Sequence, residues 1–292
     1  MKAAFKYFFY YMVLQVIGAI LFILPGLIVS LIAGNPMRSY DDFSSDTWLM
    51  SVIFLGSELL PLFVFWKMKY ASLDFKFAYD FGDLFSPAKL YLWAAVGSIG
   101  VLLFNLVTSE YVYPFDWDLD TGEFIGGISS NPIGVLCVCL FGPILEEVVF
   151  RGAILRRLLE KPWRPWVAIL VSAIFFSVAH GNLTQGVTAL VLGCFMGWVY
   201  YRTRNLWPCI LIHVLNNTIA TVLGWALAET PYAGTGGIPA AVQVITIVTG
   251  LILLGCAIRQ IVKMTRNRIL LPPPINLPPQ PQSASEPVAP AE

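Results

Sequence analysis

The chain is dominated by apolar runs long enough to cross a lipid bilayer, and this feature limits its fold more than any other. A helix needs about 20 apolar residues to cross about 30 Å of hydrocarbon. The runs are continuous and do not alternate with polar residues, which favours helices over barrel strands. The predicted spans are eight, at residues 8–33, 48–66, 90–107, 132–155, 165–180, 186–201, 206–227 and 238–261.

Composition supports an all-α, polytopic transmembrane helical bundle. Hydrophobic residues make up 57% of the chain and charged residues only 12%, whereas soluble domains carry about 25% charged residues. The first run follows Lys2 and Lys6 as in a signal peptide, but it is too long for one and is expected to be a retained span. The net charge is zero, so no basic surface points to nucleic acid; the lipid bilayer is the expected partner.

The basic residues predict how the spans are oriented. All 18 lysines and arginines except Arg38 fall on one side of the eight-span arrangement, so both termini are expected to be cytoplasmic. Four regions follow. They are residues 1–128, with spans 1–3 and an external loop; residues 129–228, with spans 4–7; residues 229–271, with span 8; and residues 272–292, a proline-rich tail expected to be disordered.

Three groups of polar residues interrupt the predicted spans 4, 5 and 7. Ionisable side chains at the centre of a span cost about 2.5–3.5 kcal/mol each on insertion scales, and they usually mark a functional site. Both histidines of the chain belong to these groups. The residues are Glu146, Glu147, Arg151, His180, His213 and Asn217.

The spacing of these residues predicts which of them share a face. Glu147 and Arg151 are four residues apart on a helix and can pair, whereas Glu146 points about 100° away. A buried ion pair that fixes helix packing would explain Glu147 and Arg151, but it would not explain the second glutamate. A carboxylate in an apolar cavity is a suitable general base, so Glu146 is the candidate.

The remaining groups have a structural and a chemical interpretation. His180 follows Phe176 by one turn, and His213 lies one turn before Asn217. Each group alone is consistent with packed, hydrogen-bonded side chains. Together with the glutamates, they favour hydrolysis of an amide. A glutamate and a histidine can activate water, and a histidine and an asparagine can donate hydrogen bonds to an oxyanion.

The three motifs EExxxR, FxxxH and HxxxN, in this order, resemble the CAAX protease and bacteriocin-processing (CPBP, Abi-type) family of intramembrane proteases. The resemblance covers residues 130–225. It implies an eight-helix membrane endopeptidase that acts on a peptide or protein substrate, so spans 4–7 would be the catalytic core. By this resemblance Glu146 is the general base, Glu147 and Arg151 orient it, His180 binds the water, and His213 and Asn217 stabilise the oxyanion.

Metal dependence stays open at this point. The family has been called metalloprotease, and a metal-free glutamate mechanism is also argued for it. The chain has no HExxH motif, yet Glu146, His180 and His213 could supply a three-ligand zinc site. We favour water activation by Glu146 and His180 without metal. The absence of targeting signals and the compact size favour a bacterial inner membrane protein.

Other functions fit parts of the pattern. The same glutamates and histidines could relay ions in a proton- or ion-coupled transporter, or the chain could be a non-catalytic membrane scaffold. Glu58 and Asn105 could line a cavity, although packing is the simpler interpretation. His180 lies 16 residues past Arg164, which is about 24 Å along a helix. We therefore expect span 5 to tilt and residues 180–186 to turn inside the bundle.

Overall fold

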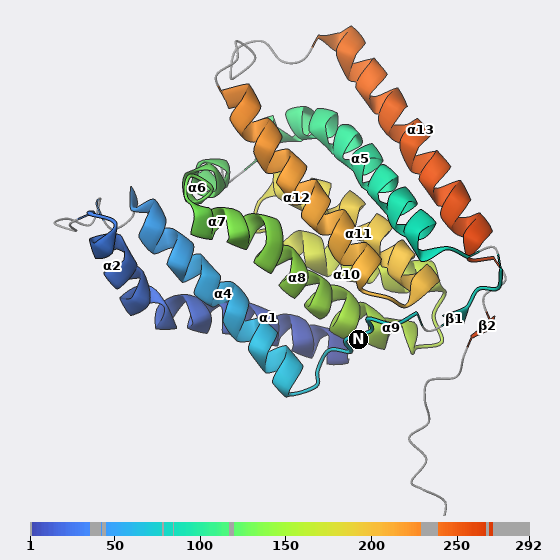
Figure 1. Ribbon diagram of the computed structural model, residues 1–292, viewed down its shortest axis with the longest axis horizontal. Coiled ribbons are helices and arrows are strands. Elements are labelled where there is room, and N and C mark those ends of the chain that lie inside the picture. The colour runs from blue at the N-terminus through green and yellow to red at the C-terminus, as the bar shows by residue number, and fades with distance from the viewer. Residues whose placement is uncertain are drawn as a thin grey trace, which may run out of the picture.

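The computed structural model describes residues 2–35, 42, 45–77, 79–83, 85–116, 120–228, 239–266 and 269–270, and nearly all of its regular structure is helical (Figure 1). The α-helices are α1 (Lys2–Leu21), α2 (Ile23–Ile32), α4 (Thr47–Lys67), α5 (Pro87–Val112), α6 (Asp120–Ile128), α7 (Pro132–Leu136), α8 (Gly142–Glu147), α9 (Arg156–Leu159), α10 (Pro165–Ala179), α11 (Leu183–Thr203), α12 (Trp207–Ala228) and α13 (Ala240–Met264). Three further segments are the 3₁₀ turn η1 (Tyr113–Phe115) and the π-helical segments η2 (Cys137–Phe141) and η3 (Val148–Leu155). Within the described part, the only β pairing joins β1 (Tyr79–Asp80) to β2 (Ile269–Leu270).

The predicted membrane bundle is confirmed. Seven helices of the described part are long and apolar enough to cross a bilayer, and the shorter α10 corresponds to the fifth predicted span. The prediction of span 1 was wrong in one respect, because the apolar run at 8–33 is divided into α1 and α2 at Phe22. Pro25 has no N–H to donate to the carbonyl of Leu21, which favours a break in the helix there.

The helices form two groups that meet along the segment from α7 to α9. Figure 1 shows α1 and α4 packed together on one side of this segment, and α5, α12 and α13 on the other. Glycines permit the closest approaches. A Cβ at Gly18 of α1 would lie 2.2 Å from the carbonyl oxygen of Gly56 in α4, and one at Gly250 of α13 would lie 2.8 Å from that of Gly100 in α5. Small residues let transmembrane backbones pack in this way.

Polar side chains cap the helices that begin at the ends of the bundle. The Asp46 carboxylate accepts a hydrogen bond from the Leu49 N–H at 2.8 Å and another from the Ser30 hydroxyl, so it joins α2 to α4. Asn131 caps α7, and its amide also donates to the Thr47 carbonyl at 3.1 Å. These contacts satisfy backbone N–H groups that have no partner inside the helix.

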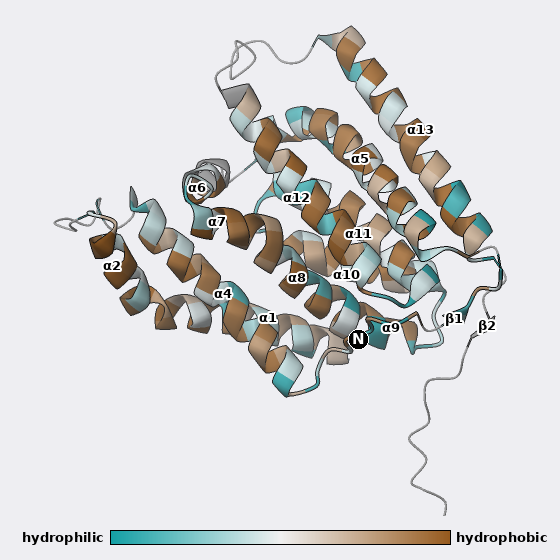
Figure 2. Cartoon of the chain, in the orientation of Figure 1, coloured by the Kyte–Doolittle hydropathy of each residue, from teal (hydrophilic) through white to brown (hydrophobic). Residues whose placement is uncertain are grey.

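Apolar side chains cover the outer faces of the bundle, as expected for a protein surrounded by lipid. Figure 2 shows long hydrophobic stretches on α2 and α13, with hydrophilic residues near the end of α13. The external loop expected after span 3 instead contains the end of α5, η1 and α6. Trp117 of that segment and the tail at 272–292 lie outside the described residues.

Candidate active site

The fourth span carries the two glutamates and departs from α-helical geometry on both sides of them. In η2 the Gly142 N–H bonds to the Cys137 carbonyl, five residues back. In the same five-residue pattern, the N–H of residue 143 would donate to the Val138 carbonyl. Residue 143 is proline and has no N–H, so this hydrogen bond cannot form. The Asn217 side chain of α12 supplies the missing donor, with Nδ2 3.0 Å from the Val138 oxygen. Such π-helical turns are frequent at functional sites.

Glu147 and Arg151 form a buried ion pair, as their spacing predicts. Nη1 of Arg151 lies 2.9 Å from Oε1 of Glu147, and the two side chains are 1% and 0% exposed. The guanidinium also donates to the Gly193 carbonyl at 3.2 Å and lies 4.8 Å from the centre of the Phe176 ring. This arginine therefore links the fourth span to α10 and α11.

His213 of α12 lies between the two glutamates. Its Nδ1 is 2.9 Å from Oε1 of Glu147, and its Nε2 is 3.4 Å from Oε2 of Glu146. Because the ionised Glu147 can only accept, Nδ1 carries a hydrogen. If Nε2 of His213 had no hydrogen and Glu146 were ionised, both atoms would be hydrogen-bond acceptors. One of the two atoms therefore carries a proton. Glu146 is 18% exposed, whereas His213 is 2% exposed. Of the side chains in this row of contacts, the Glu146 carboxylate is therefore the more accessible one.

His180 lies at the end of α10 and reaches the cluster through Phe176. The Phe176 ring packs edge-on against His180 at 4.9 Å and against His213 at 5.5 Å. Nδ1 of His180 is 2.8 Å from the Phe176 carbonyl oxygen. Since a carbonyl only accepts, Nδ1 is the protonated nitrogen and Nε2 of the neutral ring keeps a free lone pair.

The turn that follows His180 is tightly anchored. The chain turns at residues 180–182, and α11 starts at Leu183. The two carboxylate oxygens of Asp116 accept from the Leu183 and Thr184 N–H groups at 3.0 and 2.9 Å, and Asn182 caps the helix by accepting from the Gln185 N–H. A turn is present at residues 180–182, but residues 183–186, which were predicted to belong to it, are the first turn of α11. The tilt of α10 stays a prediction.

Two buried residues outside the sequence motifs complete the surroundings of Glu146. The Tyr11 hydroxyl of α1 accepts a hydrogen bond from Nε2 of Gln15 at 2.9 Å, and it interacts electrostatically with the Glu146 carboxylate. Glu58 of α4 is 2% exposed, and its Oε2 has no hydrogen-bond partner among the described residues. A Cβ at Gly142 would meet the Glu58 carboxyl at 3.8 Å.

Glu58 therefore lies near the Glu146 carboxylate. Gly142 and Glu146 are four residues apart and share a helix face, and the carboxyl groups of Glu58 and Glu146 interact electrostatically. Asn105, the other candidate of this kind, donates to the Thr188 carbonyl at 3.1 Å and packs α5 against α11. The sequence analysis missed Tyr11; its i,i+4 spacing with Gln15 inside a span is the signal that could have pointed to it.

The positions of possible metal ligands bear on the zinc alternative. Across the residues that the structure describes, no group of three or more His, Cys, Asp or Glu side chains has the geometry to hold a metal ion. Glu146 and His213 approach each other, but the Phe176 ring packs against both His180 and His213.

Comparisons with known proteins agree with the motifs. Residues 128–219 match the family described as type II CAAX prenyl endopeptidase Rce1-like. YdiL of Bacillus subtilis, which bears the name of a membrane peptidase, is 27% identical over 45% of this chain and 55% of its own length. The membrane-embedded CAAX protease MroQ of Staphylococcus aureus is 26% identical over 47% of this chain and 59% of its own length.

The extent of these matches is limited. The chain spans little more than half the length of the curated relatives it matches. No solved structure matches it. The matched segment nevertheless runs from the end of α6 into α12 and contains all six candidate residues. Over residues 128–219, this integral membrane protein is similar to the Rce1-like family of type II CAAX prenyl endopeptidases.

Proposed function

We propose that the protein is an intramembrane endopeptidase that hydrolyses a peptide bond with water activated at Glu146. The observation that carries the proposal is the chain of contacts from Arg151 through Glu147 and His213 to Glu146. Arg151 compensates the charge of Glu147, Glu147 fixes the orientation of the His213 ring, and His213 faces the base. This arrangement is a base with an orienting partner, as general-base hydrolysis requires.

In the first step, the Glu146 carboxylate takes a proton from a water molecule. The water oxygen then bonds to the carbonyl carbon of the substrate, and the carbonyl π electrons move to its oxygen. When this intermediate collapses, the C–N bond breaks and the leaving amine takes the proton from Glu146. His180 supports the same water through its free Nε2 lone pair, which can accept a hydrogen bond.

His213 and Asn217 serve the oxyanion in this proposal. A proton on Nε2 of His213 can be donated to the developing charge, and loss of one such donor costs about 10²–10³ in rate. Asn217 uses one amide hydrogen for the Val138 carbonyl, and its second amide hydrogen is available to the oxyanion. The Val138 contact also holds the side chain in place, which favours a preorganised donor.

We place the protein in a bacterial cell membrane, with both termini in the cytoplasm and a peptide or protein as substrate. The bacterial relatives with membrane peptidase and CAAX protease names support this location and substrate class. The distribution of basic residues supports the orientation.

Cleavage of a quenched peptide library by purified protein in detergent tests the proposal. Wild type is compared with Glu146→Gln and with Glu160→Gln, whose carboxylate is half exposed in a surface ion pair. We expect Glu146→Gln to abolish cleavage and Glu160→Gln to leave it unchanged, with wild-type activity persisting in a zinc chelator. Wild-type activity in Glu146→Gln would refute the assignment of the base, and loss of activity in chelator would refute the metal-free mechanism.

A further inference from the structure

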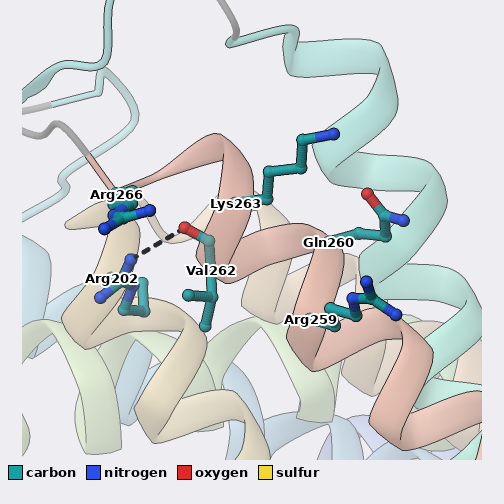
Figure 3. A pocket seen from close by; sticks show the side chains of 6 residues that line it. All are labelled: Arg202, Arg259, Gln260, Val262, Lys263 and Arg266. Atoms are coloured by element: carbon teal, nitrogen blue, oxygen red, sulfur yellow. Dashed lines mark hydrogen bonds between the residues drawn. The ribbon is translucent and has the colours of Figure 1, made fainter.

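A basic pocket lies between the ends of α11 and α13, away from the active site. Its volume is about 570 Å³, within the size range of small-molecule sites. Four of the six lining residues are cationic and none is acidic. Figure 3 shows the side chains, which are Arg202, Arg259, Gln260, Val262, Lys263 and Arg266.

Arg202 builds one wall of this pocket. Its guanidinium donates to the Thr265 hydroxyl at 2.7 Å and to the carbonyls of Thr265 and Val262 at 2.9 and 3.3 Å. These oxygens belong to the last turn of α13, where helix carbonyls lack partners within the helix. Arg202 therefore fixes the position of α11 against α13 and holds the pocket in shape.

The other three cations have no acidic partner in the part of the protein that the structure describes. Arg259, Lys263 and Arg266 are exposed, and no salt bridge joins them to a carboxylate within the described part of the chain. Elsewhere in the fold, Arg151 pairs with Glu147 and Arg156 pairs with Asp74. An uncompensated group of cations beside a cavity fits an anionic ligand.

An apolar stripe continues from the pocket along α13. Val262, which lines the pocket, is 39% exposed, and Ile258 and Leu251 are 37% and 52% exposed. With Gly255, these residues follow i, i+4, i+7 and i+11 spacing, so they share one face of the helix. A Cβ at Gly255 would meet no atom within 4 Å, so the stripe is open there. A free phosphate would use only the pocket, whereas a phospholipid would use the pocket and the stripe.

From this combination we infer that the pocket binds the phosphate headgroup of an anionic phospholipid, whose acyl chain lies along the Leu251–Val262 face of α13. Basic pockets at the ends of transmembrane helices recognise such headgroups in this way. The site goes beyond the proposed peptidase function and does not depend on it.

Native mass spectrometry of the purified full chain tests this inference. Phosphatidylglycerol and phosphatidylcholine are titrated separately, and inorganic phosphate is added as a competitor. Wild type is compared with the double variant Arg259→Gln/Lys263→Gln and with Lys67→Gln/Lys76→Gln, which removes two exposed lysines outside the pocket. Arg259→Lys keeps the charge and should keep the binding.

We expect wild type and the control variant to prefer phosphatidylglycerol, and the double variant to bind it about 25-fold more weakly. That loss is about fivefold for each charge removed, or about 1 kcal/mol for each. Equal affinity for both lipids, or an equal loss of phosphatidylglycerol affinity in the two double variants, would overturn the inference. The cations would then be a basic end of α13 without a specific lipid site. Complete displacement of the lipid by millimolar phosphate would assign the site to free phosphate instead.

Discussion

Replacing Arg151 with methionine is the most direct perturbation of the buried charges. The substitution keeps an unbranched apolar side chain but removes the guanidinium, which is 1% exposed and lies 2.9 Å from the Glu147 carboxylate. Glu147 is then left as a buried negative charge, still in contact with His213 at 2.9 Å. The contacts with the Gly193 carbonyl and the Phe176 ring are lost as well.

The expected cost follows from this geometry. Removing one partner of a buried ion pair destabilises a protein by about 3–5 kcal/mol, because the remaining charge is uncompensated. The double variant Glu147→Gln/Arg151→Met removes both charges and keeps an acceptor for His213. It should therefore be more stable than Arg151→Met by about 1–3 kcal/mol, the usual coupling between residues in contact.

Denaturant unfolding in detergent micelles, followed by fluorescence of the nine tryptophans, measures these free energies. Arg157→Met is the control, because that arginine pairs with Glu160 at 3.2 Å where both side chains are about half exposed; its loss should cost about 0–1 kcal/mol. The reasoning is refuted if Arg151→Met costs no more than Arg157→Met, or if the double variant is less stable than Arg151→Met.

Three further predictions address the surroundings of the site and the packing of the bundle. Tyr11→Phe removes a buried hydroxyl that interacts electrostatically with Glu146. Loss of a polar contact to a charged group is worth about 1.5–3 kcal/mol, so kcat/KM for peptide cleavage should fall at least about tenfold; unchanged kinetics would contradict this role. Glu58→Leu removes the buried Oε2 that has no partner in the described structure. The free energy of unfolding should therefore rise by about 1–3 kcal/mol, while peptide cleavage slows. A less stable variant would show that Glu58 is a packing residue. Gly250→Val forces a Cβ against the Gly100 carbonyl and should cost about 1–3 kcal/mol in the same unfolding assay, whereas Gly255→Val, which meets no atom within 4 Å, should be neutral.

The sequence predicted the features that depend on local spacing. Span positions follow from continuous apolar runs, and the pairing of Glu147 with Arg151 follows from their i,i+4 separation. The contact of Phe176 with His180 is also one turn along a helix. The break at Phe22 was missed because the proline that causes it lies inside an unbroken apolar run.

Features that depend on tertiary contacts were not predictable in this way. The Asn217 amide bonds to Val138 because Pro143 removes a backbone donor 74 residues earlier in the chain, and only the packing of α12 on η2 brings them together. Tyr11 and Glu58 lie in α1 and α4, which carry no motif, and reach Glu146 through the fold. The two glutamates on either side of His213 likewise come from a different helix.

The measurement that tests the account most directly is peptide cleavage in water enriched in the heavy oxygen isotope, with mass spectrometry of the products. Wild type and Glu160→Gln should release a peptide whose new carboxylate contains one heavy oxygen, and Glu146→Gln should release none. Products from Glu146→Gln at the wild-type rate, or wild-type products without the heavy oxygen, would contradict water attack promoted by Glu146.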